Sequence, residues 1–223
     1  MLLRISHVLG RRELDALAAL LQQAHFVDGR LSAGKQAQRV KRNEELSAND
    51  ERVMQLNDIV MGNLVRHPVY RNAALPHRVA APYYARYTPG MAYGLHVDDP
   101  VMGTGDRYRS DISITVFLSD PASYDGGELM VRTAFGETAV KLPAGDAILY
   151  PSSSLHRVAE VTRGERLVAV TWVQSLVRDP ARRELLYELS QARERLLKKA
   201  PDAAETAQVD YAYVNLVRMW SEV

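Results

Sequence analysis

"DISITVFLSD", residues 111–120, has the pattern of a β-strand. β-Branched residues are frequent in it, and apolar residues alternate with polar ones at Ser113 and Thr115. An alternation of this kind is typical of a strand, because successive side chains point to opposite faces of a sheet. The stretch therefore predicts a strand in the middle of the chain.

Further strand-like segments follow residue 120 at short intervals. Turn signals separate them, including Gly126-Gly127 and the run Pro143-Ala144-Gly145-Asp146. Short strands at this spacing favour an antiparallel sandwich or barrel, which we place at residues 77–177. The segments are "GGELMVRT" (126–133), "TAVKL" (138–142), "GDAILYP" (145–151), "HRVAEVT" (156–162) and "RLVAVTWVQS" (166–175).

The sequence before this β-rich zone has helical periodicity. Leu14, Leu17 and Leu21 recur at helical spacing, and a second helix is expected from about Ser47. Residues 1–76 are therefore predicted to be an N-terminal helical part packed on the core. The basic stretch "KQAQRVKR" (35–42) is interpreted as a solvated loop, with a substrate-contacting segment beside the site as the alternative.

The sequence after the β-rich zone returns to helix. Asp179 can cap a helix whose first residue is Pro180. Two apolar stripes follow, separated by "APDAAET", so residues 178–223 are predicted to form a C-terminal extension of two helices. The stripes cover apolar surface either on the same chain or in a partner subunit, and a homodimer is expected because two-fold dimers are the commonest assemblies.

Composition narrows the classes of function. The chain has 223 residues, a net charge of +1 and no cysteine. Zinc fingers, disulfides, iron–sulfur clusters and thiol catalysis are excluded, and a large nucleic-acid interface is disfavoured. No apolar run approaches the roughly 20 residues of a membrane span, and no signal peptide is visible. These features predict a soluble, cytoplasmic protein.

The pair His96 and Asp98 is the first sign of a metal site. Residues two apart on a strand present their side chains on one face. His156 is the only histidine in the later strand region and can supply a third ligand. Two histidines and one carboxylate suit non-haem Fe(II), and zinc is the alternative ion. Asp99 is rejected as the carboxylate, because a regular strand points it to the opposite face.

Arg166 opens the last predicted strand, after the turn 163–165. If that turn is a three-residue loop, Thr162 pairs with Arg166, and Arg166 faces the same side as His156. An inward arginine requires an anionic partner, and a carboxylate bound by two donors fits best. A diacid with one end on a metal and the other on Arg166 meets both needs. The alternative is that Arg166 lies on the surface of the hairpin and forms an ion pair there.

The order of these residues resembles the prolyl-4-hydroxylase-like Fe(II)/2-oxoglutarate dioxygenases. The helical N-terminus, "RYTPGMAYGLHVDDP" and the helical tail further resemble the bacterial PKHD-type hydroxylases, an iron-uptake-associated group. The resemblance covers essentially the whole chain. It rests on Tyr87, His96-Val97-Asp98, Asp125-Gly126-Gly127-Glu128-Leu129, His156, Arg166 and Trp172.

The resemblance implies an α+β fold, with a double-stranded β-helix (jelly-roll) core and flanking N-terminal and C-terminal helices. It implies Fe(II) held by His96, Asp98 and His156, 2-oxoglutarate as cosubstrate, and L-ascorbate as an iron-reducing aid. It places Tyr87 beside the 2-oxoglutarate carboxylate, although Tyr83, Tyr84 and Tyr93 lie close in sequence. Trp172 is read either as core packing or as a wall of the cosubstrate site, and Gly126-Gly127 as a turn.

The function predicted from these residues is that of a dioxygenase. It hydroxylates an unidentified peptide, siderophore-like molecule or metabolite, using O2 and converting 2-oxoglutarate to succinate and CO2. The first alternative is an iron- or 2-oxoglutarate-responsive binding module without turnover. The second is a nucleic-acid demethylase of the same superfamily, which is disfavoured because Trp172 stands where those enzymes typically carry a second arginine.

Overall fold

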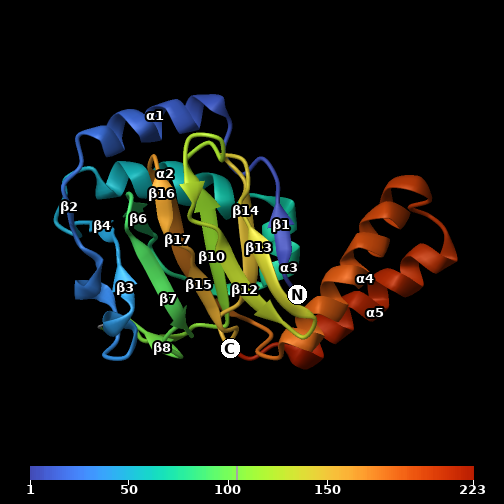
Figure 1. Ribbon diagram of the computed structural model, residues 1–223. Helices are drawn as coiled ribbons and strands as arrows, with labels where there is room; N and C mark the ends of the chain where they lie inside the picture. The colour runs from blue at the N-terminus through green and yellow to red at the C-terminus, as the bar shows by residue number, and fades with distance from the viewer. Residues whose placement is uncertain (104) are drawn as a thin grey trace.

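The computed structural model describes residues 1–103 and 105–223 and combines two main antiparallel sheets with flanking helices (Figure 1). The predicted α+β class, with its β core and helices on either side in sequence, is confirmed. The helices are α1 (Arg11–Gln22), α2 (Val53–Leu64), α3 (Pro68–Ala74), α4 (Pro180–Lys199) and α5 (Ala204–Trp220), with the 3-10 turns η1 (Gly29–Ser32) and η2 (Ala37–Arg39).

The larger sheet has eight strands, and "DISITVFLSD" supplies its inner strand β10. β10 is buried along its whole length because both faces are covered. In spatial order the sheet comprises β1 (Leu3–Ile5), β14 (Ala147–Pro151), β10 (Ile112–Phe117), β17 (Arg166–Ser175), β6 (Tyr83–Tyr87), β4 (Glu44–Leu46) and β2 (Phe26–Asp28), with β5 (Pro76–Val79) also paired to β17.

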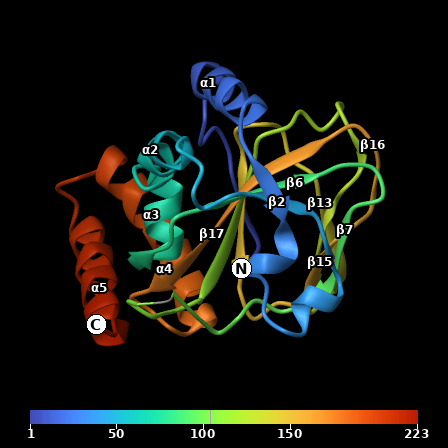
Figure 2. The same ribbon diagram turned by 90° about the vertical axis from the view of Figure 1, so that its left-hand side faces the viewer.

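The smaller sheet has five strands and lies on the opposite side of the larger sheet from α2 and α3 (Figure 2). In spatial order it comprises β13 (Gly136–Val140), β12 (Leu129–Thr133), β15 (His156–Val158), β7 (Ala92–His96) and β3 (Lys41–Arg42). The remaining strands of the described residues form two short pairs: β11 (Asp125–Gly126) with β16 (Val161–Arg163), and β8 (Val101–Met102) with β9 (Tyr108–Arg109).

Apolar side chains fill the space on both faces of the larger sheet. Successive side chains of β10 point to opposite faces of the sheet, and Ile112, Ile114 and Val116 pack toward the helices. Phe117 instead joins a second cluster between the sheets, together with Val168. The polar members of β10 also face the space between the sheets, and that space holds the candidate site described below.

The first 76 residues are less helical than their pattern predicts. β1 pairs with β14, β4 pairs with β6, and β3 pairs with β7, so this part of the chain extends both sheets. The predicted solvated loop at 35–42 is wrong at its end, where β3 forms and the Lys41 side chain is buried. These pairings join residues 40 or more positions apart, so the local periodicity of the sequence does not predict them.

The C-terminal extension forms the two predicted helices, α4 and α5, which project from one end of the β core (Figure 1). Asp179 caps α4 by accepting hydrogen bonds from the backbone N–H groups of Ala181 and Arg182, and Pro180 is the first helical residue, as predicted. Among the described residues, none of the helices has the length and apolar character that a membrane span requires.

Removal of all residues after Gln174 is expected to give an aggregating protein. The deletion removes Val177, Leu186 and the α5 side chains that cover Leu75, and it takes Tyr187 out of the main core cluster. Each large apolar side chain that loses its cover forfeits about 1.5–3 kcal/mol of burial free energy. Size-exclusion chromatography with light scattering measures the outcome. A soluble, monodisperse and active truncation contradicts this account.

Two adjacent leucines provide a milder test of the same packing. Leu186 is 0% exposed and Leu185 is 56% exposed. Leu186→Ala is expected to lower the free energy of unfolding by about 2–5 kcal/mol. Leu185→Ala is the matched control and is expected to change it by less than about 0.5 kcal/mol. Urea denaturation compares the two, and equal effects argue against a docked helix.

Candidate metal centre

His96 and His156 lie side by side on two adjacent strands of the smaller sheet. They are directly paired in register between β7 and β15, and their ring centroids are 4.2 Å apart. Asp98 follows two residues after β7 ends. Its Oδ1 atom lies 3.9 Å from His96 Nε2 and 3.7 Å from His156 Nε2. The structure thus brings together the three residues selected from the sequence, with their donor atoms within 4.8 Å of one another.

Each histidine directs a free nitrogen into this group. His96 Nδ1 lies 2.8 Å from the Gly94 carbonyl oxygen, and His156 Nδ1 lies 2.9 Å from that of Ser154. A carbonyl oxygen only accepts, so Nδ1 carries the proton and Nε2 presents its lone pair. Burial and the nearby His156 lower the pKa of His96 to about 4, which keeps this imidazole neutral at pH 7.

The second oxygen of Asp98 is anchored by hydrogen bonds. Asp98 Oδ2 accepts from the Ser113 hydroxyl and, at 2.9 Å, from the Trp172 indole N–H. The Ser152 hydroxyl lies 2.8 Å from that of Ser113. This leaves Oδ1 toward the histidines, so one oxygen is held while the other is available to an ion. Sequence reasoning missed both serines, although polar Ser113 in a buried strand is a signal for them.

Asp99 directly follows Asp98, and strand alternation does not exclude it as a ligand. Because β7 ends at His96, strand alternation does not extend to Asp98 and Asp99. Asp99 is nevertheless exposed and lies outside the group of three, with its carboxylate beside Gly34. The structure therefore groups Asp98, and not Asp99, with the two histidines.

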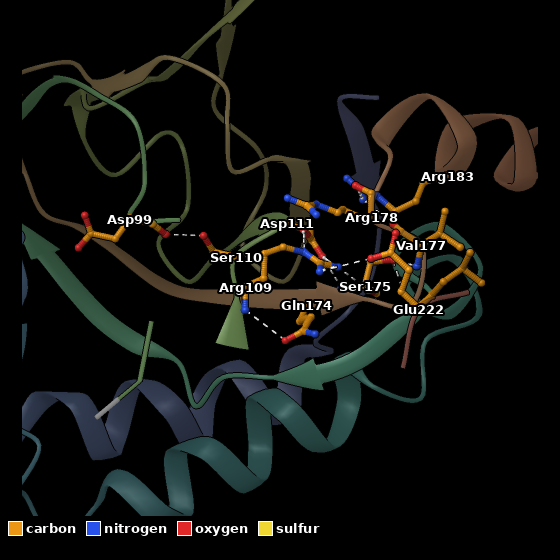
Figure 3. Close-up of polar contacts among 11 residues, drawn as sticks. Asp99, Arg109, Ser110, Asp111, Gln174, Ser175, Val177, Arg178, Arg183 and Glu222 are labelled. Atoms are coloured by element: carbon orange, nitrogen blue, oxygen red, sulfur yellow. Dashed lines mark hydrogen bonds and ion pairs between the residues drawn. The ribbon is translucent and has the colours of Figure 1, made fainter. Parts of the chain in front are cut away.

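Polar contacts link the Asp98–Asp99 loop to the C-terminal extension (Figure 3). The Ser110 hydroxyl donates to the Asp99 carbonyl, and the neighbouring Arg109 makes a two-donor ion pair with Asp111 at 2.6 and 3.0 Å. Arg109 also lies 3.6 Å from Glu222, near the end of the chain. The end of the chain thus contacts Arg109, whose neighbour Ser110 holds the Asp99 carbonyl.

Arg166 is buried between the sheets, with 1% of its surface exposed. Its strand neighbour is Tyr87 on β6, so the predicted pairing with Thr162 is wrong, although the inward direction is correct. Within residues 1–103 and 105–223, no carboxylate lies within 4.0 Å of the guanidinium, and its Nε has no hydrogen-bond partner. The charge is instead flanked by the ring of Tyr87, with Cζ 5.0 Å from the centroid.

Gly127 makes room for Arg166. Its φ of +68° lies in the left-handed region, and a Cβ there would lie 3.0 Å from the Arg166 Cδ. Gly126 has a φ of +73°, and a Cβ on it would overlap the Glu160 carbonyl at 2.0 Å. The pair therefore forms the expected turn, and Gly127 also leaves space for the Arg166 side chain.

The structure separates the tyrosines that sequence parity leaves unresolved. Tyr87 is buried opposite Arg166, whereas Tyr83 is partly exposed. Tyr84 donates to Asn57 on α2, and Tyr93 stacks on His96 with 3.6 Å between centroids. Burial raises the pKa of Tyr87 to about 12, so the phenol stays neutral at pH 7 and can donate a hydrogen bond.

A single cavity of about 610 Å³ joins these groups. The histidines, Asp98, Trp172, Tyr87 and Arg166 all line it, so a bound molecule can touch the three-residue group and the buried guanidinium at once. Two nitrogens and one oxygen leave positions open on a bound ion, and the guanidinium fork matches a carboxylate. Lys41, Asn43 and Glu45 also line the cavity, and sequence reasoning did not select them.

Comparison with known proteins finds relatives of this chain among the oxygenases. Residues 82–174 match the 2OG-Fe(II) oxygenase superfamily, and residues 180–222 match the PKHD-type hydroxylase C-terminal domain. A PKHD-type hydroxylase from Thioalkalivibrio sulfidiphilus is 55% identical, and one from Synechococcus elongatus is 45% identical. Both alignments cover 100% of each chain.

Solved structures share the fold at low sequence identity. A Pseudomonas putida prolyl-4-hydroxylase superposes with a TM-score of 0.54 and 21% identity, over 78% of this chain and 92% of the other. The carbocyclase SnoK from nogalamycin biosynthesis gives a TM-score of 0.57 and 15% identity, over 80% and 82%. These likenesses confirm the predicted double-stranded β-helix and extend no further than the fold.

Proposed function

The chain belongs to the PKHD-type hydroxylase family of 2OG-Fe(II) oxygenases, and we propose that this hydroxylase binds Fe(II) through His96, Asp98 and His156 and binds 2-oxoglutarate through Arg166 and Tyr87. Bound together, these groups supply oxidising power from O2: 2-oxoglutarate is converted to succinate and CO2, and one oxygen atom becomes a hydroxyl on a substrate C–H bond.

The observation that carries the proposal is that the buried Arg166 guanidinium has no anionic partner among the described residues. Removing a guanidinium from water is costly unless an anion compensates it. The distal carboxylate of 2-oxoglutarate can accept hydrogen bonds from the two terminal nitrogens of the Arg166 guanidinium. The neutral Tyr87 phenol can donate a hydrogen bond to the same carboxylate. The opposite end of that diacid then points along the shared cavity toward the three-residue group.

The protein contributes orientation to this chemistry. The two Nδ1–H hydrogen bonds fix the imidazole rings with Nε2 inward, while Ser113 and Trp172 hold the carboxylate of Asp98 by one oxygen. The cavity lies between the two sheets, so protein side chains replace part of the water around a bound molecule. We propose that residues 77–177 are the oxygenase core, residues 1–76 complete it and residues 178–223 brace it.

Substrate-dependent succinate release tests the proposal. We expect a screen of peptides, amino acids and metal chelators, with Fe(II), 2-oxoglutarate and air, to find a compound that accelerates succinate release. A protein that binds iron and 2-oxoglutarate yet never releases succinate supports the alternative of a binding module. The demethylase alternative is disfavoured further, because Trp172 donates to Asp98.

Ser113→Ala is expected to weaken Fe(II) binding about 10- to 100-fold, the usual effect of removing an outer partner of a metal ligand. The variant leaves Asp98 Oδ2 with the Trp172 donor alone. Ser123→Ala, at an exposed serine whose hydroxyl donates to the Asp120 carbonyl, is the control. Anaerobic Fe(II) titration measures both affinities, and equal affinities show that Ser113 does not support the site.

Four finer features of the proposal rest on the sequence. We propose that L-ascorbate assists by reducing the iron, that the protein is cytoplasmic, that it forms a homodimer, and that its substrate is linked to iron uptake. Ascorbate-dependent recovery of stalled turnover, cell fractionation, light scattering and expression under iron limitation test them in turn.

A further inference from the structure

Three polar residues from one short segment, "KRNEE" (41–45), line the cavity. Lys41, Asn43 and Glu45 are buried, whereas Arg42 is exposed and Glu44 is half-buried. This alternation follows β3 and β4, whose ends lie on either side of Asn43. We name Lys41, Asn43 and Glu45 the polar wall.

The polar wall contains a buried ion pair. Lys41 Nζ lies 2.5 Å from Glu45 Oε1, and the two side chains are 6% and 10% exposed. The Ser32 hydroxyl bridges them, at 2.5 Å from Glu45 Oε2 and 3.0 Å from Lys41 Nζ. Lys41 Nζ also lies 5.3 Å from the centroid of the Tyr93 ring, which stacks on His96. Only one aromatic ring therefore separates the ion pair from the three-residue group.

Stability alone does not account for this pair. Replacing a buried ion pair by apolar residues of similar volume is often neutral or stabilising. The pair also retains hydrogen-bonding capacity, because an ammonium has three donors and each carboxylate oxygen has a further lone pair. Asn43 adds to this, since both amide atoms are buried and have no hydrogen-bond partner in the described part of the chain.

We propose that the polar wall is the subsite that binds a neutral amide group of the hydroxylated substrate. The wall carries no net charge, so a neutral group meets it without an unbalanced ion. An amide offers an acceptor to the ammonium of Lys41 and a donor to the carboxylate of Glu45. This inference rests on the proposed function, because it names the substrate group held beside the iron.

Three probes on one scaffold test the subsite: phenylacetamide, methyl phenylacetate and phenylacetate. The protein is loaded with Zn²⁺ in place of iron and saturated with 2-oxoglutarate, so that no turnover consumes the probes and Arg166 is occupied. Ligand-observed saturation-transfer NMR measures each dissociation constant. Wild type is expected to bind the amide about tenfold more tightly than the ester, which lacks the N–H donor and differs by about 1.4 kcal/mol.

The matched variant Lys41→Met/Glu45→Leu removes both charges together and leaves no lone buried ion. It is expected to melt at or above the wild-type temperature, to keep 2-oxoglutarate binding, and to lose the preference for amide over ester. Glu45→Gln alone makes the wall cationic and is expected to strengthen phenylacetate binding about tenfold. A gain of this kind does not follow from a purely structural role.

The outcomes separate this inference from the function on which it rests. Equal binding of amide and ester by wild type overturns the subsite, as does a preference that survives in the double variant. If the double variant does not fold, unchanged phenylacetate binding by Glu45→Gln overturns it. Failure of wild type to bind Zn²⁺ with 2-oxoglutarate instead overturns the proposed function, and the amide preference is then still measured on the protein alone.

Discussion

Replacing His156 by alanine is expected to abolish iron-dependent formation of succinate. The side chain supplies one of two inward Nε2 atoms, and the remaining donors, His96 and Asp98, cannot surround the ion from three directions. The loss in Fe(II) affinity should exceed the roughly 10- to 100-fold effect of removing an outer partner. Succinate release and anaerobic Fe(II) titration measure it, and His96→Ala and Asp98→Ala should behave alike.

The fold should survive this substitution. His156 lies at the start of β15, and its backbone pairings to β12 and β7 do not involve the ring. His77→Ala is the control: His77 is exposed on β5, so its replacement should change neither Fe(II) affinity nor succinate release. Circular dichroism should superpose for all variants. Full Fe(II) binding by His156→Ala contradicts the assignment of the third ligand.

Arg166→Lys is expected to weaken 2-oxoglutarate binding about 10- to 100-fold while sparing iron. Lysine retains the charge but replaces the planar two-donor fork by a single ammonium, and each hydrogen bond to a charged group is worth about 1.5–3 kcal/mol. Titration of 2-oxoglutarate into the metal-loaded protein measures the change. Unchanged affinity for 2-oxoglutarate removes Arg166 from the cosubstrate site.

The same residue gives a second, independent effect on stability. Arg166→Met removes a buried charge that has no anionic partner in the described residues, so the melting temperature of the ligand-free protein should rise. 2-Oxoglutarate should stabilise wild type and fail to stabilise this variant. Arg163→Met is the control, because the exposed Arg163 pairs with Asp125. A lower melting temperature for Arg166→Met contradicts a binding role for its charge.

Local sequence patterns predicted much of the fold and of the site. Alternation identified β10, and the capping pair Asp179-Pro180 located the start of α4, because both signals arise within a few residues. The spacing of His96 and Asp98, with His156 as the single downstream histidine, named the group that the structure assembles.

Features that depend on distant pairing were beyond the sequence patterns. Arg166 lies beside Tyr87, 79 positions earlier, rather than across its own turn, so its inward direction came from a pairing that does not exist. Ser113 on β10 is hydrogen-bonded to Asp98, which lies in the loop after β7 and 15 positions away in the sequence. The N-terminal strands and the polar wall likewise depend on sheet edges supplied elsewhere in the chain.

Anaerobic titration of Fe(II) and 2-oxoglutarate, followed by visible absorption, tests the central claim most directly. The account predicts a weak charge-transfer band in wild type that requires both components and saturates at one iron per chain. The band should be absent in His156→Ala, and in Arg166→Lys it should appear only at higher 2-oxoglutarate concentrations. Absence of the band in wild type, or an unchanged band in His156→Ala, contradicts the account.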